Sequence, residues 1–154
     1  MKKLFYIFII LYFKFNLAYS LIEIDITRGN LNPLPVAVSP LHVDVQSENY
    51  KDLKVKELGD LISSVIEKNF KSTGLFNPLN KDAFVQKPDI AHLKPRFEDW
   101  SLITAQALVT GKILIKDQKL KIEFRLWDVA ANKEMIALAF TTTPSNWRRV
   151  AHII

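Results

Sequence analysis

Regular alternation of hydrophobic and polar residues predicts several strands. Residues 22–27 (IEIDIT) place isoleucine at every second position, which is typical of a strand buried on one face. Residues 118–129 (QKLKIEFRLWDV) alternate in the same way, and residues 133–142 (KEMIALAFTT) place apolar residues at alternate positions. Residues 105–115 (AQALVTGKILI) are apolar on both faces and are expected at the centre of a sheet. In the strand at residues 118–129 the inward-facing residues are predicted to be Leu120, Ile122, Phe124 and Leu126. In the last strand Ile136, Leu138 and Phe140 are predicted to share one face.

The connections between these strands are short enough for tight turns at residues 117–118 and 131–132, so we expect an antiparallel meander. Residues 34–41 (LPVAVSPL) and 75–80 (LFNPLN) read as two further short strands. Pro35 and Pro40 favour an edge or a strand terminus over a mid-sheet position.

A helical spacing of apolar residues predicts three helices. The clearest covers residues 55–74, where Gly74 supplies a stop and Ser63 and Ser64 are expected on the surface. A short helix follows Arg96, after a loop at residues 81–95 with at most one helical turn. The third covers the last eight residues and is expected to dock on its own sheet. The predicted apolar faces of the first and third helices are Leu58, Leu61, Ile62, Val65, Ile66 and Phe70, and Trp147, Val150, Ala151 and Ile154.

Strands mixed with helices in this order predict the α/β class, with a mixed sheet of about five strands and helices on its faces. Residues 1–20 stand apart from this domain. A positive start is followed by an unbroken apolar run over residues 4–13 and then by Ala18-Tyr19-Ser20, which is the plan of a secretory signal peptide and its helix. About ten apolar residues are too short to span a bilayer, so cleavage between Ser20 and Leu21 is favoured over a membrane anchor.

Removal of this leader changes the charge. It would take three lysines and no acidic residue from the 21 basic and 16 acidic residues, and would lower the formal net charge from +5 to +2. Nucleic-acid binding therefore loses most of its support. The chain has no cysteine, so it can be neither a lipoprotein acylated on cysteine nor a disulfide scaffold. An exported protein without thiols points to the periplasm, with no transmembrane segment after signal cleavage.

Residues capable of catalysis, cofactor binding or metal binding do not form a recognisable pattern. The histidines, His42, His92 and His152, are scattered, and each is interpreted as structural. Four isolated glycines cannot build a phosphate-binding loop. The remaining polar pairs have ordinary interpretations: Glu98-Asp99 as a helix start, Trp127-Asp128 as a covered tryptophan before a turn, and Arg148-Arg149 as a solvated helix face. We therefore predict a protein that is not an enzyme and holds no cofactor or metal.

The strand at residues 22–27 lies almost at the mature N-terminus and is followed by a segment that contains Gly29, Asn30 and Pro33. A strand tethered in this way can add to the open edge of a partner's sheet. It can equally pair with its own sheet, and the residues alone leave both possibilities open.

Several short blocks, in order, resemble the TolB family of the periplasmic Tol-Pal system. After a signal peptide come IEIDITRGNLNPLPVAVSPL, KNFKSTGLFNPL, FEDW, ALVTGKI, FRLWDV and WRRVAHII. Leu41 departs from the family, which usually has phenylalanine there. In the family the last helix leads into a six-bladed β-propeller, which this sequence does not contain.

The resemblance implies an α/β domain similar to the anticodon-binding domains of some synthetases, at residues 34–154 and ending inside its last helix. It implies that residues 21–33 form an N-terminal arm that binds the C-terminal domain of TolA. It places the surface for Pal, the peptidoglycan-associated lipoprotein, mainly on the propeller, so Pal binding is expected to be lost. The residues carried over to the TolA-type contact are Leu21, Ile22, Glu23, Ile24, Asp25, Ile26, Thr27, Arg28, Gly29, Asn30, Leu31 and Asn32.

The implied role is support of outer-membrane integrity and of envelope constriction during cell division, by a truncated TolB-like chain. The alternatives are a decayed fragment without function and an unrelated exported α/β binding domain.

Overall fold

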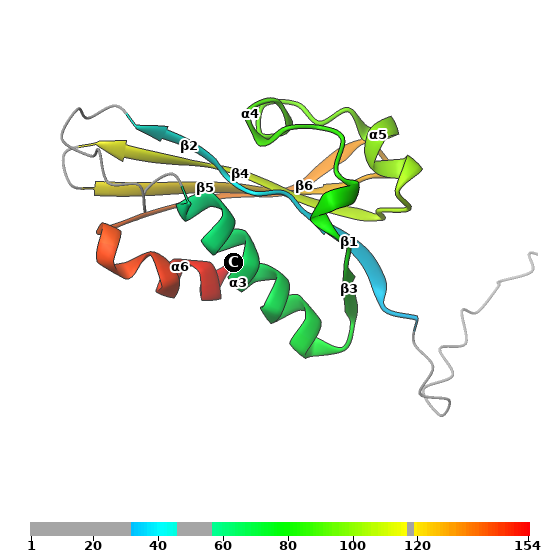
Figure 1. Ribbon diagram of the computed structural model, residues 1–154, viewed down its shortest axis with the longest axis horizontal. Coiled ribbons are helices and arrows are strands. Elements are labelled where there is room, and N and C mark those ends of the chain that lie inside the picture. Colours follow the sequence, from blue (N-terminus) through cyan, green and yellow to red (C-terminus); the bar gives the residue numbers. More distant parts are fainter. Residues whose placement is uncertain (1–31, 46–56, 117–118) are drawn as a thin grey trace, which may run out of the picture. The chain divides into compact units, whose positions relative to one another are not determined.

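The computed structural model describes residues 32–45, 57–116 and 119–154 (Figure 1). The predicted signal helix, the strand at residues 22–27 and the turn at residues 117–118 lie outside this part of the chain. The described elements, in order, are β1 (Leu34–Val38), β2 (His42–Val45), α3 (Leu58–Thr73), β3 (Phe76–Pro78), η1 (Lys81–Ala83), α4 (Pro88–Ala91), α5 (Phe97–Leu102), β4 (Ala107–Lys116), β5 (Lys119–Asp128), β6 (Lys133–Thr142), η2 (Pro144–Asn146) and α6 (Trp147–Ile153).

The strands form one mixed sheet in the order β3-β1-β4-β5-β6, and β2 also pairs with β4. The pairs β1–β3, β1–β4 and β2–β4 are parallel, whereas β4–β5 and β5–β6 form the expected antiparallel meander. The predicted fold class and the central position of β4 are therefore confirmed. β2 was not predicted, because four residues are too few to show a pattern.

Strand β1 corrects one expectation. Its prolines lie near its ends, as predicted, but the strand is not an edge, because β3 and β4 pair with it on both sides. Val36, Ala37 and Val38 are completely buried. Parallel pairing on both sides, with the short β3 and the longer β4, thus accepts a strand whose second residue, Pro35, has no N–H to donate.

Helices cover both faces of the sheet. α3 and α6 lie on one side and α4 and α5 on the other (Figure 1). The α3 side holds the larger core, in which Ile62 and Ile66 pack with Ile113 and Ile122. The smaller core on the α5 side is centred on Trp100, with Leu108 and Val129.

Helix α3 ends as predicted at Gly74, which adopts φ +71° in the left-handed region that favours glycine. Its buried arc is rotated relative to the predicted stripe. Leu61 is 41% exposed, whereas Ser63 is completely buried and therefore does not lie on the surface. The rotation follows from the helix start, where Gly59 lies against the backbone of Leu41. A Cβ at Gly59 would stand 2.1 Å from Leu41 O, so only glycine allows this approach.

Helix α6 has the predicted apolar face, with Val150 and Ala151 buried. It packs mainly against α3 and also contacts β6, rather than docking on the sheet alone. The Asn69 side chain fixes this packing, because its Nδ2 donates to Ala151 O at 3.3 Å and its Oδ1 lies 3.2 Å from His152 Nδ1. Residues 81–95 contain two short helical turns, η1 and α4, where at most one was predicted.

Candidate interaction surfaces

The predicted partner-binding arm reaches the described part of the chain at Asn32. The other predicted arm residues, 21–31, and the predicted cleavage site at Ser20 and Leu21 lie outside it. Asn32 and Pro33 are exposed, and the next residue, Leu34, donates its backbone N–H to Leu75 O at 2.8 Å. The arm is therefore attached directly to β1, a buried strand that lies between β3 and β4.

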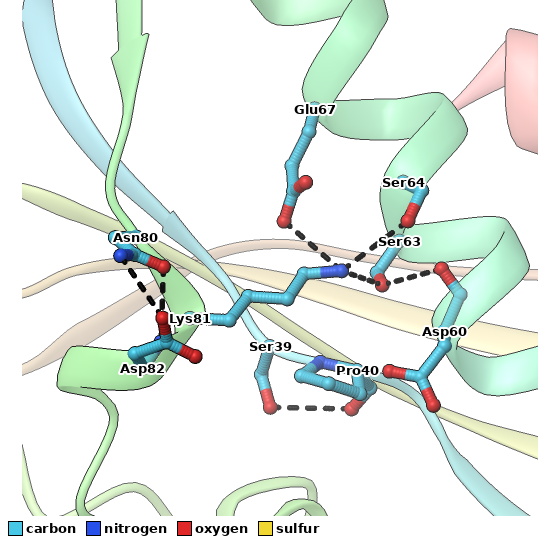
Figure 2. A network of polar contacts seen from close by, with 9 residues as sticks. All are labelled: Ser39, Pro40, Asp60, Ser63, Ser64, Glu67, Asn80, Lys81 and Asp82. Atoms are coloured by element: carbon cyan, nitrogen blue, oxygen red, sulfur yellow. Dashed lines mark hydrogen bonds and ion pairs between the residues drawn. The ribbon is translucent and has the colours of Figure 1, made fainter.

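A lysine from η1 organises a polar cluster on α3. Figure 2 shows the Lys81 side chain reaching across to the helix, where Nζ donates to Ser63 Oγ at 2.8 Å and to Ser64 Oγ at 3.4 Å. Nζ also lies 3.2 Å from the buried Oε1 of Glu67. Asn80 caps η1, because its Oδ1 accepts the backbone N–H of Asp82 at 3.1 Å. The cluster ties the segment after β3 to the outer flank of α3.

A serine beside a lysine raises the question of nucleophilic catalysis. A lysine that acts as a general base must have its amine free to take a proton, whereas Nζ of Lys81 is held in an ion pair with Glu67 at 3.2 Å. Ser63 is completely buried, and its hydroxyl donates to Asp60 O at 3.0 Å. This geometry is that of a structural tether. The sequence signal for it is weak: Ser63 lies one turn after Gly59, at the margin of the buried arc.

Two histidines interpreted as scattered lie together. The rings of His42 in β2 and His92 after α4 stack with centroids 4.6 Å apart and an interplanar angle of 5°. His92 Nδ1 donates to Pro88 O at 2.9 Å, and Arg125 Nη1 donates to His92 O at 3.0 Å. Burial, His92 and Lys112 lower the pKa of His42 below its usual 6.5. The stack joins α4 to the sheet, and the lowered pKa favours the neutral form of His42.

On the α5 side of the sheet, Gln86 is a buried polar residue that several hydrogen bonds share. Its role was not predicted from the sequence. It is 4% exposed, and its Oε1 accepts both the indole N–H of Trp100 and the backbone N–H of Arg96, each at 3.0 Å. Its Nε2 lies 3.5 Å from Lys94 O. No sequence pattern marks this residue, because its partners come from a segment 8–14 positions later.

The interpreted polar pairs have the predicted environments. Trp127 lies edge-on to Phe97 of α5 and donates its indole N–H to Thr110 Oγ1 at 2.9 Å. Asp128 starts the turn, because its Oδ1 accepts the N–H of Ala131 at 2.8 Å. The other predicted pairs are also confirmed, since α5 begins with Glu98 and Asp99 in its first turn, and Arg148 and Arg149 are exposed on α6.

Strand β6 forms the exposed edge of the meander. The predicted face is confirmed by the register, in which Ile136, Leu138 and Phe140 stand opposite Leu126, Phe124 and Ile122. Much of this face is open, because Ile136 is 45% exposed and Leu138 is 50% exposed. β6 pairs with β5 on one side, and no described strand pairs with its other side.

In residues 32–45, 57–116 and 119–154, no three His, Asp or Glu side chains come together as metal ligands would. None of the helices in these ranges has the length and apolar character needed to cross a bilayer.

Comparison with known proteins covers almost the whole chain. A family model described as the TolB amino-terminal domain matches residues 22–135. The Tol-Pal system protein TolB of Pelagibacter ubique (strain HTCC1062) is 65% identical over 156 aligned residues, which cover 100% of this chain. The chain spans 34% of the length of that relative.

Solved structures share the fold. TolB from Acinetobacter baumannii superposes with a TM-score of 0.58 at 16% identity, covering 79% of this chain and 26% of that chain. LpoB of E. coli gives a TM-score of 0.52 at 7% identity, covering 72% and 58% of the two chains. At such low identities the likeness shows the fold alone.

Proposed function

Because the chain belongs to the TolB amino-terminal domain family, we propose that it is a non-enzymatic protein-interaction domain of the Tol-Pal system. Membership of the family removes the alternative of an unrelated α/β binding domain. We propose that the protein is exported to the periplasm with cleavage between Ser20 and Leu21. There it supports outer-membrane integrity and envelope constriction during division.

The proposed contact is with a TolA-like C-terminal domain, through the arm at residues 21–32. The observation that carries it is the junction at Asn32, where two exposed residues precede the first ladder bond of β1. The arm alternates isoleucine with Glu23 and Asp25, so a strand formed from it would present one apolar and one acidic face. Such a segment can add to the edge of a partner's sheet, where its backbone supplies affinity and its isoleucines supply specificity.

The described residues favour binding over catalysis. The contacts of Lys81 with Ser63 and Ser64 belong to a structural tether, and the stacked histidines hold α4 to the sheet. The chain spans 34% of its curated relative, and the proposal assigns these residues no Pal contact.

The test is calorimetric titration of a purified TolA C-terminal domain into the protein and into a variant lacking residues 21–32. We expect the deletion to abolish measurable binding and to leave the far-ultraviolet circular dichroism spectrum unchanged. Ile24→Pro should weaken binding nearly as much, because proline removes a backbone donor and fixes φ. Gln106→Ala, at an exposed position outside the arm, is the control and should bind like the parent.

Unchanged affinity after the deletion would refute the proposed contact. A deletion that unfolds the domain would show instead that the arm pairs with its own sheet. Mass spectrometry of protein exported by a Gram-negative host should give a mature N-terminus at Leu21. Recovery of intact Met1 in the membrane fraction would contradict the predicted cleavage.

A further inference from the structure

The described edges of the sheet differ in how well they are protected against pairing with another strand. β3 has three residues and ends in Pro78, and β2 has four residues with His42 and Asp44 among them. Short strands, proline and charge are the usual devices that blunt a sheet edge. β6 has ten residues, and from Met135 to Thr142 it carries neither a charge nor a proline. Within residues 32–45, 57–116 and 119–154, the one such device on β6 between Met135 and Thr142 is a register shift opposite Leu126 and Trp127, near one end.

The apolar face of β6 extends the larger core outward. Ile122, Phe124 and Leu126 of β5 form one row on the α3 side, and Phe140, Leu138 and Ile136 form the next row. The side chains of this second row differ in their exposure along the strand. Phe140 packs against the core and stacks on Phe124 with centroids 6.2 Å apart, whereas Leu138 and Ile136 are half exposed.

We propose that the edge of β6 pairs with β6 of a second copy of this chain, antiparallel, about a two-fold axis perpendicular to the sheet. An antiparallel edge pair is isologous, so the same residues must suit both copies. With Leu138 on the axis, Ile136 of each copy stands opposite Phe140 of the other. The exposed end of the apolar row in one copy then lies beside the packed end of the row in the other copy. The hydrophobic core thus continues from one sheet into the other.

The charges and the second face of β6 agree with this arrangement. Lys133 and Glu134 lie beyond the register shift, at the end of the strand that approaches the uncharged Thr142 and Thr143 of the other copy, so no like charges oppose one another. On the α5 side, β6 presents Ala137, Ala139 and Thr141, which are exposed and too small to obstruct an incoming strand. A heterologous strand would need its own apolar alternation, whereas a second β6 supplies the matching row by symmetry.

The test is the mass of the chain as a Gram-negative host produces it, measured by sedimentation equilibrium over a range of concentrations. We expect a dimer, and we expect Leu138→Lys to weaken self-association at least ~100-fold, because two unpaired charges would be buried together on the axis. Leu75→Lys is the matched control. Leu75 is 55% exposed and precedes β3 at the opposite edge of the sheet, so this variant should associate like the parent.

A mixture of Leu138→Lys and Leu138→Glu should restore a dimer that neither variant forms alone, because opposite charges then meet across the axis. A merely unfolded variant could not be rescued in this way, and circular dichroism of each variant provides the folding control. A parent chain that stays monomeric at every concentration would overturn the proposal. Equal weakening by Leu138→Lys and Leu75→Lys, or no rescue in the mixture, would also overturn it.

Discussion

Replacement of Gln86 by leucine should destabilise the domain by about 3 kcal/mol, although leucine has a similar size and greater hydrophobicity. The loss arises because the substitution leaves a buried hydrogen-bond donor without an acceptor. Trp100 is 1% exposed, and its indole N–H donates to Gln86 Oε1 at 3.0 Å. A buried donor that loses its acceptor costs about 1–3 kcal/mol, because it gave up water on folding and gains nothing in return.

The second donor contributes less. The backbone N–H of Arg96 also reaches Gln86 Oε1 at 3.0 Å, but it is only partly buried and can recover a water molecule. Its loss should add about 1 kcal/mol, the net value of one ordinary hydrogen bond. Against a total stability of about 5–15 kcal/mol for a domain of this kind, the combined change should be readily measured.

Urea unfolding followed by circular dichroism measures the effect, with an unchanged slope as the sign of an unchanged unfolded state. Gln106→Leu is the matched control, because Gln106 is exposed and its change should stay within about 0.5 kcal/mol. A double-mutant cycle isolates the indole bond. In a Trp100→Phe background the donor is absent, so Gln86→Leu should cost about 1–3 kcal/mol less than in the parent.

A loss below about 0.5 kcal/mol for Gln86→Leu would refute this reasoning, since it would mean that water satisfies the indole after the substitution. Additive losses in the cycle would show that the penalty comes from packing and not from the hydrogen bond.

Other features of the fold can be tested in the same way. Phe124→Ala should lower stability by about 3–5 kcal/mol, whereas Lys121→Ala on the other face removes only an exposed ion pair worth about 0–1 kcal/mol; equal losses would contradict the β5 register. Gly59→Ala should destabilise by about 2 kcal/mol in urea despite better helix propensity, because the added Cβ meets a backbone oxygen at 2.1 Å. Since the folded pKa of His42 lies below its unfolded value of 6.5, stability should fall as pH drops below that value, and a His42→Phe variant unfolded across the same pH series should lose this contribution. Hydrogen exchange should be faster in α6 than at the centre of β5, because a helix of seven residues has few contacts to protect it.

The sequence predicts those strands and helices that bury one face and expose the other, because one-sided burial leaves a periodic pattern of apolar residues. Alternation in β5 and helical spacing in α3 reflect which face meets the core, so both elements could be predicted locally. In α3 the spacing gave the buried face only approximately, because Leu61 is exposed and Ser63 is buried. Pairing partners could not be read in this way. The parallel contacts that place β1 between β3 and β4 join residues far apart in sequence, and no local period records them.

Local sequence patterns also do not predict which polar residues are held by partners from other elements. Gln86 and Lys81 belong to types that are usually exposed, and they are held inside by partners from other elements. β6 shows the converse. Its apolar alternation matches that of a buried strand, but alternation identifies only the face on which residues lie, and whether anything covers that face depends on the neighbouring elements.

The position of β1 also has a mechanical consequence. Any pull on the arm reaches the domain at Leu34 and runs along a strand flanked by two parallel neighbours. Force along the axis of such a strand loads its ladder bonds in shear, so that they share the tension and must give way together. Force applied across the edge of β6 would instead open its bonds one after another, as a zipper opens. The strand that carries the arm is thus held on both sides, which suits the partner-binding role proposed for the arm.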